Sequence, residues 1–313
     1  MVMMLPEHAV QYLPLPLENY VDVRDFNAGI FHRYGVIKRR RSQKRKVEKL
    51  DILDCICAFD IEATNIDSIE QAVMYVWQFQ IDTDLTVFGR TWDEFLWMLK
   101  EILKVLPERC ELVVYIHNAS YEHSFIKGVY DFEPEDVFAT QRRKVLYFRM
   151  FNRFEFRCSY RMSNLNLKDF TCKYKVKHMK LLDFEYDLPR YWFTPLTVEE
   201  LRYCQNDVLG LVEAIRAVLI DEKETLMSVP LTSTGFIRKQ LKKIVYDNLG
   251  KDYAKPFFPT PELYTLMRRA FRGGDTHCNR YYVDDILEDV NSVDRSSSYP
   301  DVLCNGFFQS RRL

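Results

Sequence analysis

Residues 52–64 read ILDCICAFDIEAT, a short apolar run interrupted by acids. The run predicts a buried strand in which Asp60 and Glu62 are two residues apart. Side chains at that spacing leave the same face of a strand. The strand therefore presents two carboxylates side by side, and carboxylates are the oxygen ligands that Mg²⁺ prefers. By itself, such a pair is more typical of an exposed strand end.

Strand and helix patterns alternate beyond this stretch. AVMYVWQFQID and LTVFGRT predict two more strands, at 72–82 and 85–91. The helical spacing of apolar residues over 91–106 predicts a helix capped by Thr91 or Asp93. We further expect a buried strand at 110–119, a hairpin at 145–160, a long helix from Thr197 and a helical region over 232–249. This alternation indicates a mixed α/β core.

Two later motifs add polar groups to the acid pair. Residues 117–122 read HNASYE and fall where a strand turns into a helix, a place where side chains project into a cleft. They contribute a third acid, Glu122. In YCQND, Tyr203 and Asp207 are four residues apart and share one helical face. Capping and packing explain each motif taken alone, but together with the acid pair they predict carboxylates that converge on two cations.

In this order, the motifs DIE, HNxxYE and YxxxD resemble the tyrosine-bearing branch of the DEDD exonuclease superfamily. The resemblance implies an RNase H-like sheet that uses two Mg²⁺ or Mn²⁺ ions to release nucleotides from 3′ ends. Tyr203 would orient the attacking water. Glu122 departs from the family pattern, because members usually have Asp there. The implied metal ligands are Asp60, Glu62, Glu122 and Asp207.

Residues next to these motifs are expected to contact the nucleic acid. His117, Asn118 and Tyr121 are residue types that hydrogen-bond to, and stack on, a single-stranded end. Lys180, in HMKLLDFEYD, matches the place of a lysine that contacts the scissile phosphate in related exonuclease domains. Such a lysine would neutralise developing charge. A surface lysine explains Lys180 equally well.

The last part of the chain carries a second set of motifs. FRGG at 271–274 resembles the YxGG linker motif of family B DNA polymerases, in which glycines let the backbone approach the template strand. VDRSSSYP at 293–300 resembles their first palm motif, with Ser298 where that family usually has Leu. The implied roles are metal binding by Asp294, packing under the incoming sugar by Tyr299, and DNA binding by Arg272, Gly273 and Gly274.

From about residue 55 to its end, the chain is similar to the amino-terminal half of protein-primed family B DNA polymerases of bacteriophages and related elements. We expect a basic N-terminal extension at 1–54, an exonuclease domain at 55–225, and a linker with the start of a palm at 226–313. The implied partners are DNA, as single-stranded 3′ ends and primer-template, and a terminal protein primer.

Neither a KxxxNSxYG fingers helix nor a second DTD metal site follows the palm motif. We therefore expect no polymerisation from this chain alone, and a second chain carrying the rest of the palm is a further candidate partner. Two alternatives stay open. A self-contained DEDD exonuclease explains 55–225 but gives FRGG and VDRSSSYP no role. A catalytically inactive nucleic-acid-binding module would differ from both enzymes in lacking metal binding.

Charge and composition narrow the protein class. The formal net charge is −1, yet the run KRRRSQKRKVEK from Lys38 to Lys49 holds eight basic residues and one acid. Such a run suits phosphates, although a solvated face explains it as well. No CxxC pair, signal peptide or apolar run of roughly 18 residues is present. We expect a protein of the cytoplasm, or of the host cell cytoplasm if phage-encoded, with no membrane partner.

Overall fold

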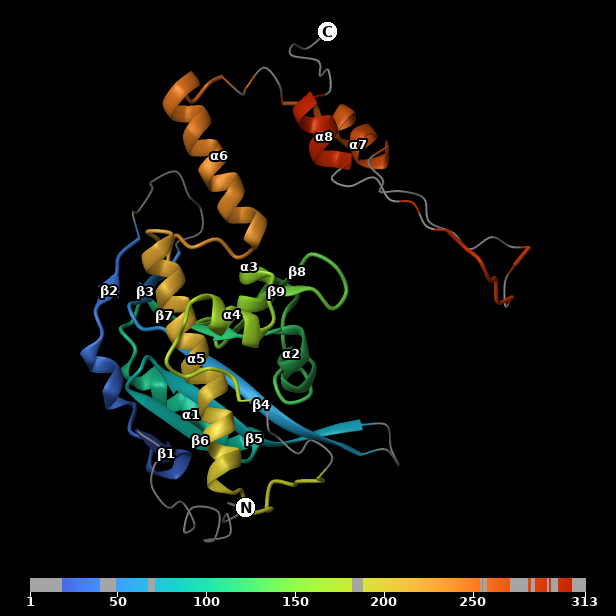
Figure 1. Cartoon of the computed structure of the whole chain (residues 1–313). Helices are drawn as coiled ribbons and strands as arrows, with labels where there is room; N and C mark the ends of the chain where they lie inside the picture. Colours follow the sequence, from blue (N-terminus) through green and yellow to red (C-terminus); the bar gives the residue numbers. More distant parts are fainter. Residues whose placement is uncertain are drawn as a thin grey trace. The chain divides into compact units, whose positions relative to one another are not determined.

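The chain divides into two compact units, Met1–Arg238 and Lys239–Leu313. The computed structural model describes residues 19–39, 49–66, 71–181, 188–253, 255, 258–270, 281–282, 285–291, 293 and 298–305. Figure 1 shows the sheet and most of the helices in the first unit.

A ten-stranded mixed sheet forms the centre of the first unit. Its main path runs β1-β6-β5-β4-β7-β10-β9-β8, and β3 pairs with both β2 and β7. The pairs β1–β6, β4–β7, β7–β10 and β3–β7 are parallel, and the remaining pairs are antiparallel. The predicted mixed α/β class is confirmed. The strands are β1 Tyr20–Asp22, β2 Val36–Ile37, β3 Asp51–Leu53, β4 Cys57–Ile66, β5 Gln71–Ile81, β6 Leu85–Gly89, β7 Cys110–Ile116, β8 Val137–Ala139, β9 Val145–Met150 and β10 Phe154–Cys158.

Helices cover both faces of this sheet. On one face, α1 (Trp92–Val105) packs its buried Phe95 and Leu99 onto the strands, together with Phe31 of the 3₁₀ helix η3 (Ala28–Arg33). On the other face, α4 (Leu167–Lys173) and α5 (Val198–Asp221) close a second apolar cluster. The shorter elements are η2 Val23–Asp25, α2 Ser120–Ile126, η5 Pro134–Asp136 and α3 Ser159–Ser163.

The central strand β4 presents opposite faces to these two layers. Phe59 and Ile61 point into the cluster under α1, whereas Ala58 belongs to the cluster under α5. Because side chains alternate along a strand, Asp60 and Glu62 lie on the α5 side. A register shift between Glu62 and Ala63 marks a bulge directly after the two acids. Bulges re-aim side chains and are frequent next to active sites.

Both long helices of the first unit begin at the predicted residues. Thr91 caps α1 and Thr197 caps α5, each in a capping box with the glutamate three residues later. A capping box satisfies two backbone N–H groups that would otherwise lack partners, which fixes the helix start. The predicted hairpin is also present, as β9 and β10.

The compact unit does not end at the predicted boundaries of 54/55 and 225/226. Strands β1, β2 and β3 come from the segment expected to be an extension, and Phe26 and Phe31 of that segment are core residues. Beyond residue 225, Leu226 and Val229 are buried in the cluster under α5. Long-range strand pairing and burial extend the unit at both ends, and neither is visible in local composition.

The described residues that follow α5 contain three helices, and the first of them, α6 (Ser233–Leu249), begins before the unit boundary. The others are α7 (Pro261–Ala270) and α8 (Ser298–Asn305). The backbone of Tyr299 lies in the first turn of α8. Arg272, Gly273, Gly274 and Asp294 lie outside the described residues. None of the helices in the described ranges combines the length and hydropathy of a bilayer-spanning segment.

Candidate active site

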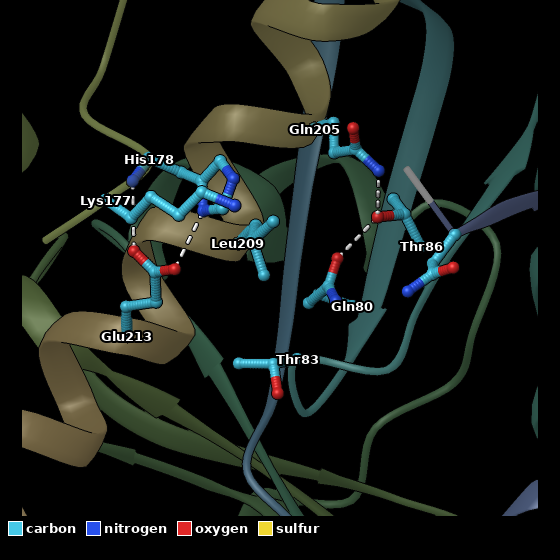
Figure 2. A pocket seen from close by; sticks show the side chains of 9 residues that line it. Gln80, Thr83, Thr86, Lys177, His178, Gln205, Leu209 and Glu213 are labelled. Atoms are coloured by element: carbon cyan, nitrogen blue, oxygen red, sulfur yellow. Dashed lines mark hydrogen bonds and ion pairs between the residues drawn. The ribbon is translucent and has the colours of Figure 1, made fainter. Parts of the chain in front are cut away.

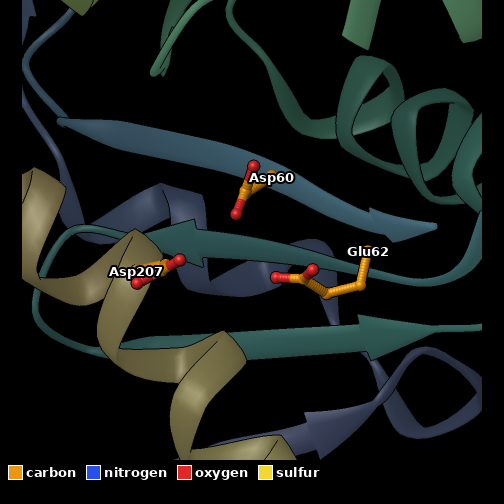
Figure 3. A group of neighbouring side chains, drawn as sticks. All are labelled: Asp60, Glu62 and Asp207. Carbon is orange, nitrogen blue, oxygen red and sulfur yellow. The ribbon is translucent and has the colours of Figure 1, made fainter. Parts of the chain in front are cut away.

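Three carboxylates converge between β4 and α5. Asp60 and Glu62 come from the strand, and Asp207 comes from the buried face of the helix (Figure 3). One oxygen of each lies within 4.8 Å of the others. Three negative charges at this spacing repel one another strongly in a partly dry environment. Positive charge relieves this repulsion, and besides the nearby Lys180 a divalent cation bound by oxygen ligands fits the arrangement.

Glu122 lies beside this trio on α2. The residue is 2% exposed, and burial together with the charge of Asp60 raises the pKa of its carboxyl. The other three acids converge without it, so its role as a metal ligand stays a prediction. A carboxyl buried against another carboxyl is nevertheless unusual, because each disfavours the charge of the other.

Two oxygens in this cluster lack hydrogen-bond partners among the described residues. They are Oδ1 of Asp207 and Oε2 of Glu122, both fully shielded from solvent. Buried polar atoms are almost always satisfied, and the exceptions often mark a site for an ion or a ligand. Burial, and next the charge of Asp207, raise the pKa of Asp60 to about 7. All-oxygen donors, mutual repulsion and unsatisfied oxygens fit Mg²⁺ or Mn²⁺.

Lys180 and Tyr203 border the trio. The Lys180 ammonium donates to Oδ2 of Asp207 at 2.5 Å and to the Tyr203 hydroxyl at 2.8 Å. It also lies 4.8 Å from the centre of the Tyr203 ring. The lysine side chain keeps 25% of its surface exposed. A cation and a hydroxyl thus lie directly beside Asp207.

The segment that carries Lys180 is fastened to α5. Glu213 accepts from the His178 backbone N–H at 3.0 Å and lies 2.7 Å from His178 Nδ1 (Figure 2). Asn206 donates to the Met179 carbonyl at 3.1 Å. At Gly210 the two backbones touch, since a Cβ there would lie 2.0 Å from the His178 carbonyl oxygen. These contacts set the path of the chain immediately before Lys180.

A cavity of about 170 Å³ is lined on one side by Lys177, His178 and Glu213. Figure 2 shows Gln205, Thr86 and Gln80 on its far wall, joined in one chain of hydrogen bonds. Gln205 donates to the Thr86 hydroxyl at 2.8 Å, and Thr86 donates to Gln80 Oε1 at 2.5 Å. These polar groups satisfy one another, so they tie α5 to β5 and β6.

The predicted DNA-contacting residues lie at the turn from β7 into α2. Asn118 adopts a φ of 72°, a left-handed conformation that asparagine tolerates. Tyr121 is 43% exposed, whereas His117 packs face to face with Phe170. Burial, and next the charge of Lys180, lower the pKa of His117 to about 4, so its ring is neutral at pH 7. Their contact with nucleic acid stays a prediction.

Two residues near the acids were not anticipated. Gln78, opposite Asp60 in the β4–β5 pair, donates to Asp60 Oδ2 at 3.2 Å. Arg190 lies close enough to Glu62 to oppose the rise in pKa that burial and Asp60 cause there. The only signal for Gln78 was that it is one of two glutamines, with Gln80, in the otherwise apolar run AVMYVWQFQI. Arg190 had no local signal.

Solved structures with similar folds include several of one polymerase. Phi29 DNA polymerase complexed with primer-template DNA and incoming nucleotides superposes with a TM-score of 0.54 and 17% identity. Its complex with single-stranded DNA gives a TM-score of 0.56 and 19% identity. The chain shares this fold. Both matches cover 73% of the chain and 41% of Phi29 DNA polymerase, so the chain spans about two fifths of that protein's length.

No protein-family model matches the chain, and no curated protein does. At identities below 20%, the match to Phi29 DNA polymerase establishes likeness of fold.

Proposed function

We propose that this protein is a DNA polymerase-related enzyme whose first unit is a metal-dependent 3′→5′ exonuclease. The convergence of Asp60, Glu62 and Asp207 within 4.8 Å carries the proposal. The order of these acids along the chain, on a strand and then on a late helix, matches the exonuclease motifs that the sequence resembles. The shared fold with Phi29 DNA polymerase supports it further.

Each residue of the cluster has a defined task in phosphodiester cleavage. Asp60, Glu62 and Asp207, with Glu122 alongside, would hold Mg²⁺ or Mn²⁺, which would activate water and stabilise the leaving oxygen. The Tyr203 hydroxyl, beside Asp207, would orient the attacking water by a hydrogen bond. The Lys180 ammonium would offset negative charge that develops on the phosphate.

DNA is the substrate that this proposal favours. Phi29 DNA polymerase is solved with single-stranded DNA and with primer-template DNA, which supports both as ligands here. The exposed Tyr121 and Asn118 would contact the strand end.

Protein-primed replication adds a terminal protein as a partner, and a second chain could supply the rest of a palm. Asp294, Tyr299 and the FRGG glycines would serve the polymerase part.

The test is stepwise cleavage of 5′-labelled single-stranded DNA. We expect a ladder of products shortened from the 3′ end in Mg²⁺ or Mn²⁺, and none in EDTA. Asp60→Asn and Asp207→Asn should abolish the ladder, because each removes a charged ligand. Glu199→Gln is the matched control, since Glu199 is an exposed acid on the same helix as Asp207.

Three results would separate the alternatives. Full activity in Asp60→Asn would refute the site. DNA binding without cleavage and without Mn²⁺ binding would favour a catalytically inactive module. Equal degradation of RNA and DNA would favour a self-contained exonuclease of broad specificity.

A further inference from the structure

Two aromatic side chains stand exposed on the loop that leads into α5. Tyr191 is 37% exposed and Phe193 is 55% exposed. Their rings stack on each other, with centroids 5.6 Å apart and planes 11° from parallel. Trp192 meets Phe193 edge-on at 5.4 Å. The loop thus displays preformed aromatic surface to solvent.

A buried arginine holds the backbone of this loop. Arg90, only 5% exposed, donates through Nη2 to the carbonyls of Tyr191 and Thr194, at 2.9 and 2.7 Å. Its Nε donates to the Tyr75 carbonyl at 2.7 Å, which anchors it in the sheet. Tyr191 and Thr194 also bond each other across the turn. A buried guanidinium that donates to two carbonyls of one loop restrains the backbone of that loop.

A second arginine ties the loop to the strand that carries the acids. The Arg190 backbone accepts from and donates to the Thr64 hydroxyl, at 2.7 and 2.9 Å. Thr64 is two residues beyond Glu62 on β4. The Arg190 guanidinium pairs with Glu200 in the first turn of α5. The aromatic loop is therefore fastened beside the carboxylate cluster.

Packing continues this link from the other side. Leu196, at the end of the loop, lies in one buried cluster with Leu201 and Tyr203. The hydroxyl of Tyr203 accepts a hydrogen bond from Lys180 beside the carboxylates. The loop and the carboxylates thus share rigid supports on both β4 and α5.

We propose that Tyr191 and Phe193 form a stacking platform for unpaired bases of a nucleic-acid strand whose 3′ end lies at the carboxylates. Solvent-exposed aromatic rings on a rigid support bind bases of any sequence, because every base has a π face. The platform extends the substrate contact beyond the terminal nucleotide. This inference rests on the proposed exonuclease function, and the following experiment separates the two.

The experiment measures binding of fluorescently labelled oligothymidylates in the presence of Ca²⁺. It compares the Asp60→Asn variant, which should not cleave the oligonucleotide, with the same variant that also carries Tyr191→Ser and Phe193→Ser. For an oligonucleotide of about ten residues, loss of one stacked base should weaken affinity roughly 5-fold or more. A dinucleotide should bind equally to both proteins. Trp97→Ser is the matched control, since Trp97 is 42% exposed on α1.

Further arms exclude a general effect. Tyr191→Phe keeps the ring and should retain affinity, and an unchanged melting temperature would show that the loop variants fold. Equal affinity of the serine variant for the long oligonucleotide, or equal loss for both lengths, overturns the platform. Because the readout is binding, it decides the platform even if the wild-type chain cleaves nothing, which would refute the exonuclease alone.

Discussion

At the scale of single residues, the site concentrates acids where burial disfavours their charge. Asp60, Glu62, Glu122 and Asp207 all have pKa values raised by burial as the first cause. A protein keeps such groups together only when another requirement outweighs the cost to folding. Among them, Glu122 differs from the exonuclease motif that the sequence resembles, which usually has Asp there, and is therefore the residue to test.

Glu122→Gln should lower the affinity for Mn²⁺ roughly 10- to 100-fold while leaving the fold intact, because it removes a carboxylate from beside Asp60. Glu122→Asp should retain more affinity than Glu122→Gln, since it keeps the charge. Isothermal titration with Mn²⁺ measures both. Wild-type affinity in Glu122→Gln would mean that the three converging acids suffice.

A separate group of charges stabilises the fold away from the site. Glu155 on β10 is nearly buried and pairs with Arg157 at 2.8 Å and with Arg149. Burial alone would raise the pKa of Glu155, but the two arginines hold it below its ordinary value. The pair therefore stabilises the protein above the unfolded pKa of about 4.3, and this stabilisation is lost as the pH falls through the folded pKa.

Glu155→Gln should destabilise the protein by about 3–5 kcal/mol at pH 7, because it leaves Arg157 buried without its charged partner. The difference from wild type should shrink as the pH falls below the folded pKa of Glu155, where the wild-type carboxyl is protonated in both the folded and the unfolded protein. Urea unfolding at pH 7 and at a series of lower pH values measures it. Glu101→Gln, in a surface pair with Lys104, should cost at most about 1 kcal/mol.

Sequence reasoning reached some site residues because their spacing is local. A spacing of two residues along a strand puts Asp60 and Glu62 on one face. A spacing of four residues along a helix puts Tyr203 and Asp207 on one face. Gln78 and Arg190 were not predicted. Gln78 comes next to Asp60 through the pairing of β4 with β5, and Arg190 comes near Glu62 through the contact of its loop with Thr64. The resemblance singled out Lys180, and the structure puts its ammonium on Asp207.

At the scale of elements, the contact between α5 and the segment before Lys180 allows a clear prediction. Gly210→Ala should slow DNA cleavage at least several-fold, because the added Cβ would displace His178 and with it Lys180. Alanine favours helices over glycine, so α5 itself should not weaken. Gly35→Ala, where a Cβ meets nothing within 4 Å, is the matched control.

A double-mutant cycle shows whether Gly210 acts through Lys180. In a Lys180→Ala background, Gly210→Ala should cause no further loss of rate. An additional loss of the same size in that background would mean that Gly210 acts on the site by another route.

Elements with signals in their own sequence were predicted well. Thr91 and Thr197 start α1 and α5, and the 145–160 hairpin is present. The strands β1 and β2 were missed, since they are two or three residues long and are defined by pairing with β6 and β3. Pairing over such separations leaves no local pattern of hydrophobic residues. The run 52–64, predicted as one strand, contains parts of two, β3 and β4.

At the scale of the molecule, the first unit contains every buried cluster found among the described residues. A chain ending after Arg238 should therefore unfold cooperatively at a melting temperature close to that of the whole protein. Calorimetry measures it, and nuclease assays on the same material would show whether the site survives. A shortened chain that aggregates or melts without cooperativity would contradict the division at Arg238.

The mixed α/β class followed from the alternation of patterns, and the position of the unit boundary did not. Leu226 and Val229 fill the cluster under α5 although they follow the end of that helix. Whether a residue belongs to a core depends on which surface it meets, and a single sequence does not state that.

The origin of the acids on β4 and α5 also bears on synthesis in the cell. Asp60 and Glu62 leave the ribosome long before Asp207, and Lys180 and Tyr203 emerge in between. A nascent chain that has made the strand but not the helix holds two acids without their third partner. The proposed nuclease activity would then require α5 to have docked on β4.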